Sequence, residues 1–260
     1  MDIREKFNYY YYEQADPRVT DWPLMGSMWP TFFILVSYVY VVFQCGPRYM
    51  KNKPAYDLRT FIRCYNIFQI VTNAYIVREI LAVYPDAAAL RCVPGDYSTT
   101  PSALRIARAC YWVSLLKVID LIETVIFVLR KKNNQITFLH VYHHITTVLA
   151  ALISLRYVAT GMAVFYPATN CSVHVIMYTY YLLSSIEGIN KKVYPFKKYV
   201  TIIQMVQFVF LICHAIISLL PSCPVPRLPG LAMLPNVIFN FTLFYNFYKK
   251  SYMQPKKKKE

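Results

Sequence analysis

The sequence is poor in glycine, in closely paired cysteines and in charge. Only six glycines occur in 260 residues, and they form neither a P-loop nor a GxGxxG pattern, which argues against a Gly-rich nucleotide-binding loop. The seven cysteines form no CxxC pair, so they offer no zinc motif of that kind and no dense disulfide framework. Charged residues make up 16% of the chain. Signatures of the common soluble nucleotide-binding and zinc-binding domains are therefore missing.

Apolar side chains are abundant instead. The chain is 57% hydrophobic and 17% aromatic, and its mean hydropathy of +0.32 is too high for a soluble domain of this size. Spanning a bilayer takes about 17 to 25 residues. Seven runs are that long: 28–44, 61–83, 109–129, 137–155, 162–185, 199–220 and 231–248. The sequence predicts an all-α membrane protein with seven transmembrane helices.

The charge distribution predicts a topology. Although the net charge is +15, the basic residues form short clusters after the first, third, fifth and seventh runs, which indicates membrane topology rather than nucleic-acid binding. By the positive-inside rule, the basic tail 249–260 is cytosolic and the acidic segment 1–27 is lumenal, on either side of a transmembrane domain at 28–248. Lys257 and Lys258 fit the dilysine signal that returns membrane proteins to the endoplasmic reticulum, so we expect a multi-pass protein of that membrane.

Two expectations concern cysteine. Cys92 and Cys223 both fall in predicted lumenal loops, where an oxidising compartment would permit a disulfide between them. Cys171 lies among polar residues, and we interpret it as a small buried side chain rather than as a nucleophile.

Three of the five histidines, His140, His143 and His144, occupy one helical turn of an apolar run. Imidazoles three and four residues apart project from the same face of a helix. Burying them costs free energy unless each finds a partner, and ionisable groups at membrane depth usually mark a functional site. We therefore predict a functional centre here rather than a packing cluster.

Polar residues recur at steps of three or four in three other predicted helices. The stripes are Lys117, Asp120, Glu123 and Thr124; Asn170, His174, Met177, Tyr178 and Tyr181; and Thr201, Gln204, Gln207 and His214. Such stripes face lipid only at high cost, so they are expected to face a cavity. Their predicted depths favour a cytosol-facing polar catalytic layer beneath a blind apolar pocket, which suits an amphiphile with a charged head and a hydrocarbon tail.

Taken together, these motifs resemble the fatty-acid elongase family, the very-long-chain 3-oxoacyl-CoA synthases of the endoplasmic reticulum. The ordered set that carries the resemblance is DPRVTDWPLM at 16–25, FVLRKK at 127–132, HVYHH at 140–144, NCSVHVIMYTYY at 170–181 and TIIQMVQ at 201–207. One motif departs from the family. Where the family reads KxxExxDT, this chain reads KVIDLIET at 117–124, with the two acids exchanged.

The resemblance implies an acyltransferase. It would condense a long-chain acyl-CoA with malonyl-CoA into a 3-oxoacyl-CoA two carbons longer and release carbon dioxide and CoA. No cofactor and no nucleic acid are implied, whereas the reductases and dehydratase of the elongation cycle are implied as partners. Homo- or hetero-oligomers are compatible with it.

The resemblance also implies roles for individual residues. We expect His143 to accept the acyl group and His174 to assist malonyl decarboxylation and carbon attack. His140, His144 and Asn170 would orient these groups or donate hydrogen bonds. The remaining candidates for holding or supporting the CoA substrates are Lys117, Asp120, Glu123, Arg130, Lys131, Tyr178, Tyr181, Gln204 and Gln207.

Two other functions fit parts of the pattern. A di-iron desaturase or hydroxylase also places histidine boxes in a membrane, but that chemistry needs about eight ligands, and this chain has five histidines and one box. A seven-helix receptor or proton-coupled transporter could use the polar layer as a relay. A transport path needs polar residues through both halves of the bilayer, and the lumenal half holds little beyond His214 and the Arg78–Glu79 pair.

Overall fold

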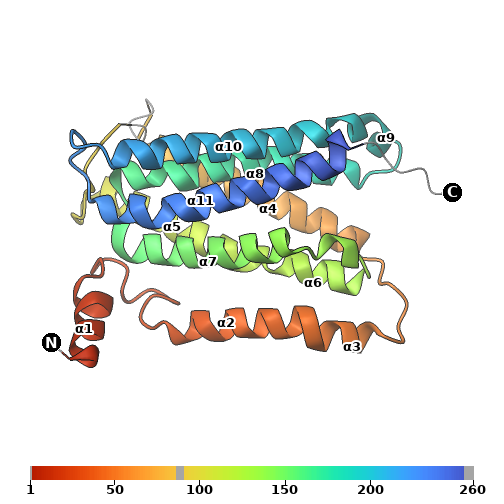
Figure 1. Cartoon of the computed structure of the whole chain (residues 1–260), viewed down its shortest axis with the longest axis horizontal. Helices are drawn as coiled ribbons and strands as arrows, with labels where there is room; N and C mark the ends of the chain where they lie inside the picture. Colours follow the sequence, from red (N-terminus) through yellow and green to blue (C-terminus); the bar gives the residue numbers. More distant parts are fainter. Residues whose placement is uncertain (1, 86–90, 255–260) are drawn as a thin grey trace. The chain divides into compact units, whose positions relative to one another are not determined.

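The computed structural model describes residues 2–85 and 91–254, and every regular element in them is a helix. The chain divides into two compact units, one formed by 1–57 and 78–165 and the other by 58–77 and 166–260. The first unit holds α1 (Ile3–Asn8), α2 (Trp29–Tyr40), α3 (Gly46–Met50), α5 (Pro101–Asp120), α6 (Ile122–Leu129) and α7 (Phe138–Val158) (Figure 1). The second holds most of α4 (Arg59–Leu81) and α8 (Phe165–Ser184), with α9 (Ile189–Val193), α10 (Lys197–Ser218) and α11 (Arg227–Tyr248).

Within the described residues, four helical segments are long and apolar enough to cross a membrane: Trp29–Met50, Phe138–Val158, Ile189–Ser218 and Arg227–Met253. They coincide with the first, fourth, sixth and seventh predicted runs. Helices also occupy the other three predicted positions, as α4, as α5 with α6, and as α8. Those helices contain more polar and charged residues, which lowers their hydropathy. The all-α membrane class is confirmed, and a count of seven spans stays a prediction.

The third predicted run, 109–129, is not one continuous helix. The α-helix is interrupted at Leu121. There the Leu121 N–H donates to Val118 O at 3.2 Å and the Thr124 N–H donates to Leu121 O at 3.3 Å, which is the tighter 3₁₀ pattern. The helix also begins before the apolar run, because Thr100 accepts a capping hydrogen bond from the Ala103 N–H and Pro101 occupies the first turn. The break separates Asp120 from Glu123.

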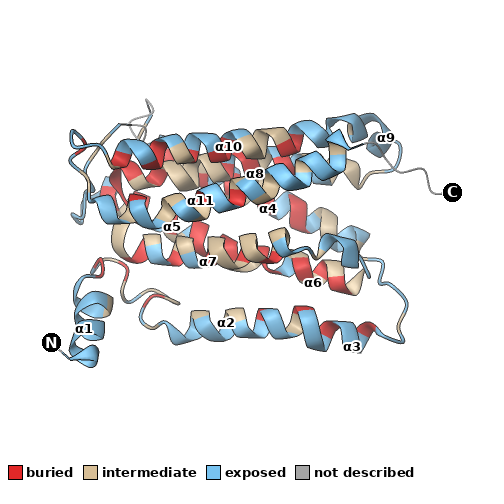
Figure 2. Cartoon of the chain, in the orientation of Figure 1, coloured by how far each residue is buried: buried red, intermediate tan, exposed pale blue. Residues whose placement is uncertain are grey.

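The first membrane segment presents one narrow buried face. Tyr38, Val42, Gly46 and Met50 are buried at steps of four along α2, a π-helical turn and α3. A Cβ at Gly46 would lie 2.6 Å from Val128 Cγ1, so glycine is what lets α3 approach α6 this closely. Most of α2 is otherwise exposed (Figure 2), as expected for a helix that faces lipid.

The N-terminal segment is fastened to the end of α7 by Arg156, which is buried. Its guanidinium donates to Tyr11 O at 2.9 Å and to Met25 O, and its own carbonyl accepts from the Asp16 N–H at 2.8 Å. Asp16 also pairs with Arg18 at 2.6 Å, and both side chains are almost fully buried. The DPRVTDWPLM motif therefore packs onto the bundle of the first unit.

In the second unit, α10 packs along α11. The rings of Phe208 and Phe244 lie 5.1 Å apart, and a Cβ at Gly230 would overlap Ser218 Oγ, so the helices touch there. The start of α4 is tied to the end of α8 by a hydrogen bond of 2.7 Å from Arg63 Nη2 to Ser185 O.

The cysteines fall into two groups, disulfide-bonded residues and free thiols. Cys92 and Cys223 are disulfide-bonded, whereas the other five cysteines are free thiols. The oxidised state predicted for both residues is confirmed, and Cys171 is fully buried, as expected for a packing residue. The pairing of Cys92 with Cys223 stays a prediction.

Candidate active site

The histidine box occupies the first turns of α7. Thr137 Oγ1 accepts a hydrogen bond of 3.2 Å from the His140 N–H and so fixes where the helix begins. The ring centroids of His140 and His144 lie 4.3 Å apart, and those of His143 and His144 lie 6.0 Å apart. His144 is buried and the other two rings are half-buried. The structure thus brings all three predicted rings into one cluster.

The two exchanged acids of the KVIDLIET motif have different partners. Asp120 Oδ2 lies 3.1 Å from Lys117 Nζ, and the two side chains are 4% and 6% exposed. Glu123 Oε2 lies 3.7 Å from His144 Nε2. That distance is longer than a hydrogen bond and makes an ion pair only when the imidazole is protonated. Asp120 therefore neutralises a buried cation, while Glu123 faces the histidine box.

Thr124, the last residue of that motif, contacts the box directly. Its Oγ1 lies 2.9 Å from His140 Nε2 and 2.9 Å from the hydroxyl of Tyr38 on α2. Thr124 is fully buried and Tyr38 is 5% exposed. The sequence reasoning missed Tyr38, because a tyrosine in an otherwise apolar span carries no motif. The available signal was its place at the head of the four-residue stripe shared with Val42 and Gly46.

The second unit contains the other predicted histidine. His174 is buried on α8, and its ring centroid lies 5.5 Å from that of Tyr178, which is 1% exposed. Tyr178 in turn contacts Tyr181 on its own helix, where Tyr181 is exposed. Across the unit, the Tyr178 ring meets that of Tyr65 on α4 at 6.1 Å.

Amide side chains near His174 retain hydrogen-bonding capacity. The Oδ1 of Asn170, one turn before His174, is buried and has no hydrogen-bond partner among the described residues. On α10, Gln207 is buried, and Gln204 Nε2 donates to Met177 Sδ at 3.1 Å. A thioether is a weak acceptor. The unpaired oxygen of Asn170 and the weakly bonded amide of Gln204 therefore have hydrogen-bonding capacity to offer a substrate.

A ladder of hydrogen-bonded polar side chains runs along α4. Gln69 Nε2 donates to the Tyr65 hydroxyl at 2.7 Å, and Asn73 Nδ2 donates to Gln69 Oε1 at 3.1 Å. Gln69 and Asn73 are fully buried, and Asn66 Nδ2 is buried without a partner in the described structure. The spacing of four from Tyr65 to Gln69 to Asn73, within the second predicted apolar run, is the sequence signal for this ladder.

The basic residues after α6 form its C-terminal cap. The Lys132 N–H donates to Phe127 O at 2.8 Å and the Lys131 N–H donates to Val128 O at 3.0 Å, which is the Schellman pattern. Lys131 occupies the left-handed position that usually belongs to glycine, with φ of 52°. Its side chain is exposed and that of Arg130 is half-buried.

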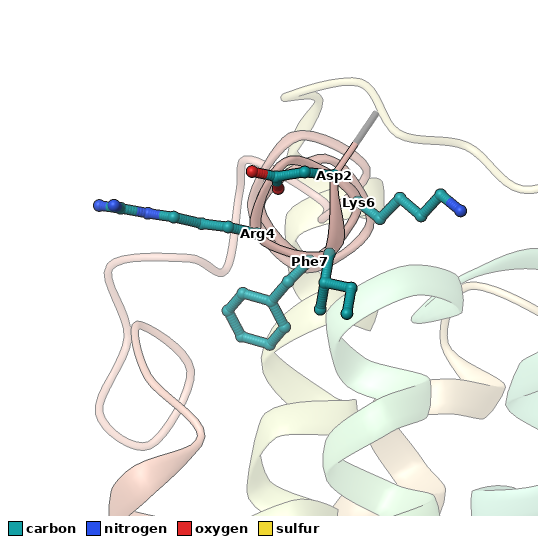
Figure 3. Close-up of a pocket in the computed structure, with 5 residues that line it drawn as sticks. Asp2, Arg4, Lys6 and Phe7 are labelled. Carbon is teal, nitrogen blue, oxygen red and sulfur yellow. The ribbon is translucent and has the colours of Figure 1, made fainter.

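The surface hollow at α1 adds no functional group to the site. The hollow shown in Figure 3 is an open surface against α1, lined by Asp2, Ile3, Arg4, Lys6 and Phe7. Arg4 and Lys6 project to opposite sides of that helix, and none of the predicted site residues lies there. Over 2–85 and 91–254, no three His, Cys, Asp or Glu side chains are grouped so that they could hold a metal ion.

Comparison with known proteins assigns the family. The model of the ELO: GNS1/SUR4 family matches residues 23–260. The chain belongs to the ELO (GNS1/SUR4) family. Very long chain fatty acid elongase 4 of Mus musculus is 39% identical over 246 residues, which is 94% of this chain and 78% of the relative. Very long chain fatty acid elongase 1 of Mus musculus is 39% identical over 249 residues, 94% of this chain and 89% of the relative.

Relatives of this ELO family protein also occur in insects. A very long chain fatty acid elongase of Aedes aegypti is 34% identical over 261 residues, covering 100% of this chain and 73% of the relative. Every predicted site residue lies inside the part of the chain that the family model matches.

Proposed function

We propose that this protein catalyses the condensing step of very-long-chain fatty acid elongation. It is a membrane-bound acyltransferase that joins a long-chain acyl-CoA to malonyl-CoA, forms a 3-oxoacyl-CoA two carbons longer, and releases carbon dioxide and CoA. The observation that carries this conclusion is the match of the ELO family over residues 23–260, which includes both histidine-bearing motifs.

In the first half-reaction, His143 attacks the acyl thioester. A neutral imidazole nitrogen forms a bond to the carbonyl carbon, the carbon–sulfur bond breaks, and CoA leaves as the thiol after taking up a proton. Clustering of His140 and His144 around His143 supports this role, because neighbouring rings can orient the nucleophile and accept its proton.

In the second half-reaction, His174 assists malonyl-CoA. The bond to the terminal carboxylate breaks, carbon dioxide leaves, and the electron pair becomes an enolate whose carbon attacks the acyl-imidazole carbonyl and frees His143. Hydrogen bonds to the thioester oxygen stabilise the enolate. We assign these donors to the side-chain N–H groups of Asn170, Gln204 and Gln207 and to the hydroxyl of Tyr178, which lie on α8 and α10 in the same unit as His174.

Charged residues of the first unit support the substrates. Lys117, Asp120 and Glu123 hold the histidine box in a polar setting, and their pairings with each other and with His144 support that role. Arg130 and Lys131 bind CoA phosphates at the exposed end of α6. In the second unit, Tyr181, which is exposed on α8, contributes to holding the CoA substrates. The reaction is redox-neutral and uses no cofactor.

The protein resides in the endoplasmic reticulum membrane, with seven spans, a lumenal N-terminus and a cytosolic C-terminus. The basic clusters between apolar segments support this topology. Lys257 and Lys258, the proposed dilysine signal, lie outside the described residues. The reductases and dehydratase of the elongation cycle act on its product and are its expected partners, and the polar layer opens to the cytosol, where acyl-CoA is supplied.

Transfer of labelled malonyl-CoA carbon into 3-oxoacyl-CoA by purified protein tests this function. We would offer a series of acyl-CoAs without added metal and with a chelator present. Product should form with the wild type and fall at least about 100-fold in His143→Ala and in His174→Ala, the usual range for a positioned catalytic group.

Cys171→Ser is the matched control, since Cys171 is a buried neighbour of His174 on the same helix. We expect it to stay active. A wild-type protein that makes no 3-oxoacyl-CoA from any acyl-CoA contradicts the proposal, and loss of activity on chelation turns attention to bound iron.

A further inference from the structure

We propose that Tyr38 of α2 is a positioning residue for the histidine box, acting through Thr124 to fix the ring and the tautomer of His140. This inference deepens the proposed condensing function and rests on it. None of the sequence motifs includes Tyr38.

The three side chains form a continuous hydrogen-bonded chain. Tyr38 Oη and Thr124 Oγ1 lie 2.9 Å apart, and Thr124 Oγ1 and His140 Nε2 lie 2.9 Å apart. Both distances are those of good hydrogen bonds. Because Tyr38 is 5% and Thr124 0% exposed, water competes little for these groups, and an unpaired hydroxyl there would be costly.

Elementary chemistry gives the chain a direction. A phenol hydroxyl is a better donor than an aliphatic hydroxyl and a poorer acceptor, so Tyr38 donates to Thr124. The single hydroxyl proton of Thr124 is then free to donate to His140 Nε2. A ring nitrogen that accepts carries no proton, which places the proton of the neutral ring on Nδ1.

The ring of His140 is held from its faces as well. Its centroid lies 5.1 Å from that of Phe127 and 4.3 Å from that of His144. His144 is the ring whose Nε2 faces Glu123. Rotation of His140 therefore disturbs His144, and the hydroxyl chain from Tyr38 sets the orientation of the box at its helix-start end.

The contact between Tyr38 and Thr124 depends on the close approach of the first membrane segment to α6. Gly46 sits against Val128 at a distance that no side chain would allow, which brings the first membrane segment onto α6. Tyr38 lies on that buried face, whereas Tyr40, on the same helix, is 56% exposed. Tyr40 thus offers a matched control on the same helix.

The first test compares turnover of Tyr38→Phe and Tyr40→Phe. Loss of a partner that orients a functional histidine costs about 10- to 100-fold in activity. The kcat of Tyr38→Phe should therefore fall at least about tenfold with KM little changed, whereas Tyr40→Phe should match the wild type.

Substitutions of Thr124 test the same hydrogen-bonded chain. The kcat of Thr124→Val should fall as much as that of Tyr38→Phe, and Thr124→Ser, which keeps the hydroxyl, should retain most of the activity. The double variant Tyr38→Phe, Thr124→Val should lose no more activity than either single variant.

The second test reads the tautomer directly, without activity. In protein labelled with ¹⁵N-histidine, and with the His140 signals assigned by their absence in His140→Gln, Nε2 of His140 should appear as an unprotonated nitrogen and Nδ1 as a protonated one. Tyr38→Phe should shift this balance, and Tyr40→Phe should not.

Equal kcat and an unchanged His140 spectrum in Tyr38→Phe and Tyr40→Phe overturn the inference. If Tyr38→Phe changes the His140 tautomer while His143→Ala stays fully active, the positioning contact stands and the proposed acyl transfer to His143 is the part that fails.

Discussion

The polar residues of the two units are paired in different ways. In the first unit, polar side chains from different helices meet each other: Glu123 of α6 faces His144 of α7, and Tyr38 of α2 reaches the box through Thr124 of α6. Lys117 and Asp120 pair along α5. In the second unit, the ladder on α4 is bonded within one helix. Amide atoms of Asn66 and Asn170 there have no partner in the described structure.

That difference suggests a division of labour. A network of paired side chains fixes the orientation of its members, which suits the nucleophilic role proposed for the histidine box. Buried amides without partners keep hydrogen bonds available for a ligand, which suits the unit that would receive malonyl-CoA. Substitutions in the two units can test this comparison, because they should affect stability and substrate binding to different extents.

The largest effect is expected at the buried ion pair of the first unit. Lys117→Met leaves the Asp120 carboxylate buried without its cation, which typically costs about 3 to 5 kcal/mol. The double variant Lys117→Met, Asp120→Leu should recover most of that stability, because it removes both charges. Thermal unfolding in detergent measures this. Equal melting temperatures for the wild type and Lys117→Met would show that the pair does not stabilise the unit.

A smaller effect should separate bonded from open amides in the second unit. Asn73→Leu removes the donor to Gln69 Oε1 and leaves it buried, at a cost of about 1 to 3 kcal/mol. Asn170→Leu removes an amide whose oxygen has no described partner, so the melting temperature should change little. Because the variant also loses the N–H donor proposed to bond the thioester oxygen, the KM for malonyl-CoA should rise about tenfold, the equivalent of one hydrogen bond.

The measurement compares the melting temperatures and the KM values for malonyl-CoA of Asn73→Leu and Asn170→Leu. A large loss of stability in Asn170→Leu with an unchanged KM would mean that its amide serves packing, and the contrast between the units would weaken.

The smallest effect is expected at the cap of α6. Lys131 holds a positive φ that glycine adopts freely, so Lys131→Gly should stabilise the protein slightly, by less than about 1 kcal/mol. Lys132→Gly, at the next position, should instead be neutral or slightly destabilising. If Lys131 binds CoA, Lys131→Gly also raises the KM for acyl-CoA. If Lys131→Gly is more stable and its KM for acyl-CoA is unchanged, Lys131 caps α6 and does not bind CoA.

Several features of the helices could be predicted from the local periodicity of the sequence. The stripe at Asn170 to Tyr181 on α8 follows from helical spacing, because residues three and four apart share a face whatever the helix packs against. The predicted stripe at Lys117 to Thr124 is instead divided between α5 and α6 by the break at Leu121. The same logic gathered His140, His143 and His144. Hydropathy located helices at all predicted positions, but it could not place their ends, since α5 begins at a polar cap and breaks at Leu121.

The sequence by itself determined the helical class, the family and the residues that share each helix face, because these depend on composition and short-range spacing. Only the tertiary structure decided which faces meet. The contact from Tyr38 to Thr124, the pairing of Glu123 with His144, and the open amide of Asn170 arise from helix approach and burial. Hydrogen bonds and ion pairs act over a few ångströms, and helix periodicity alone does not specify which side chains from different segments come within that reach.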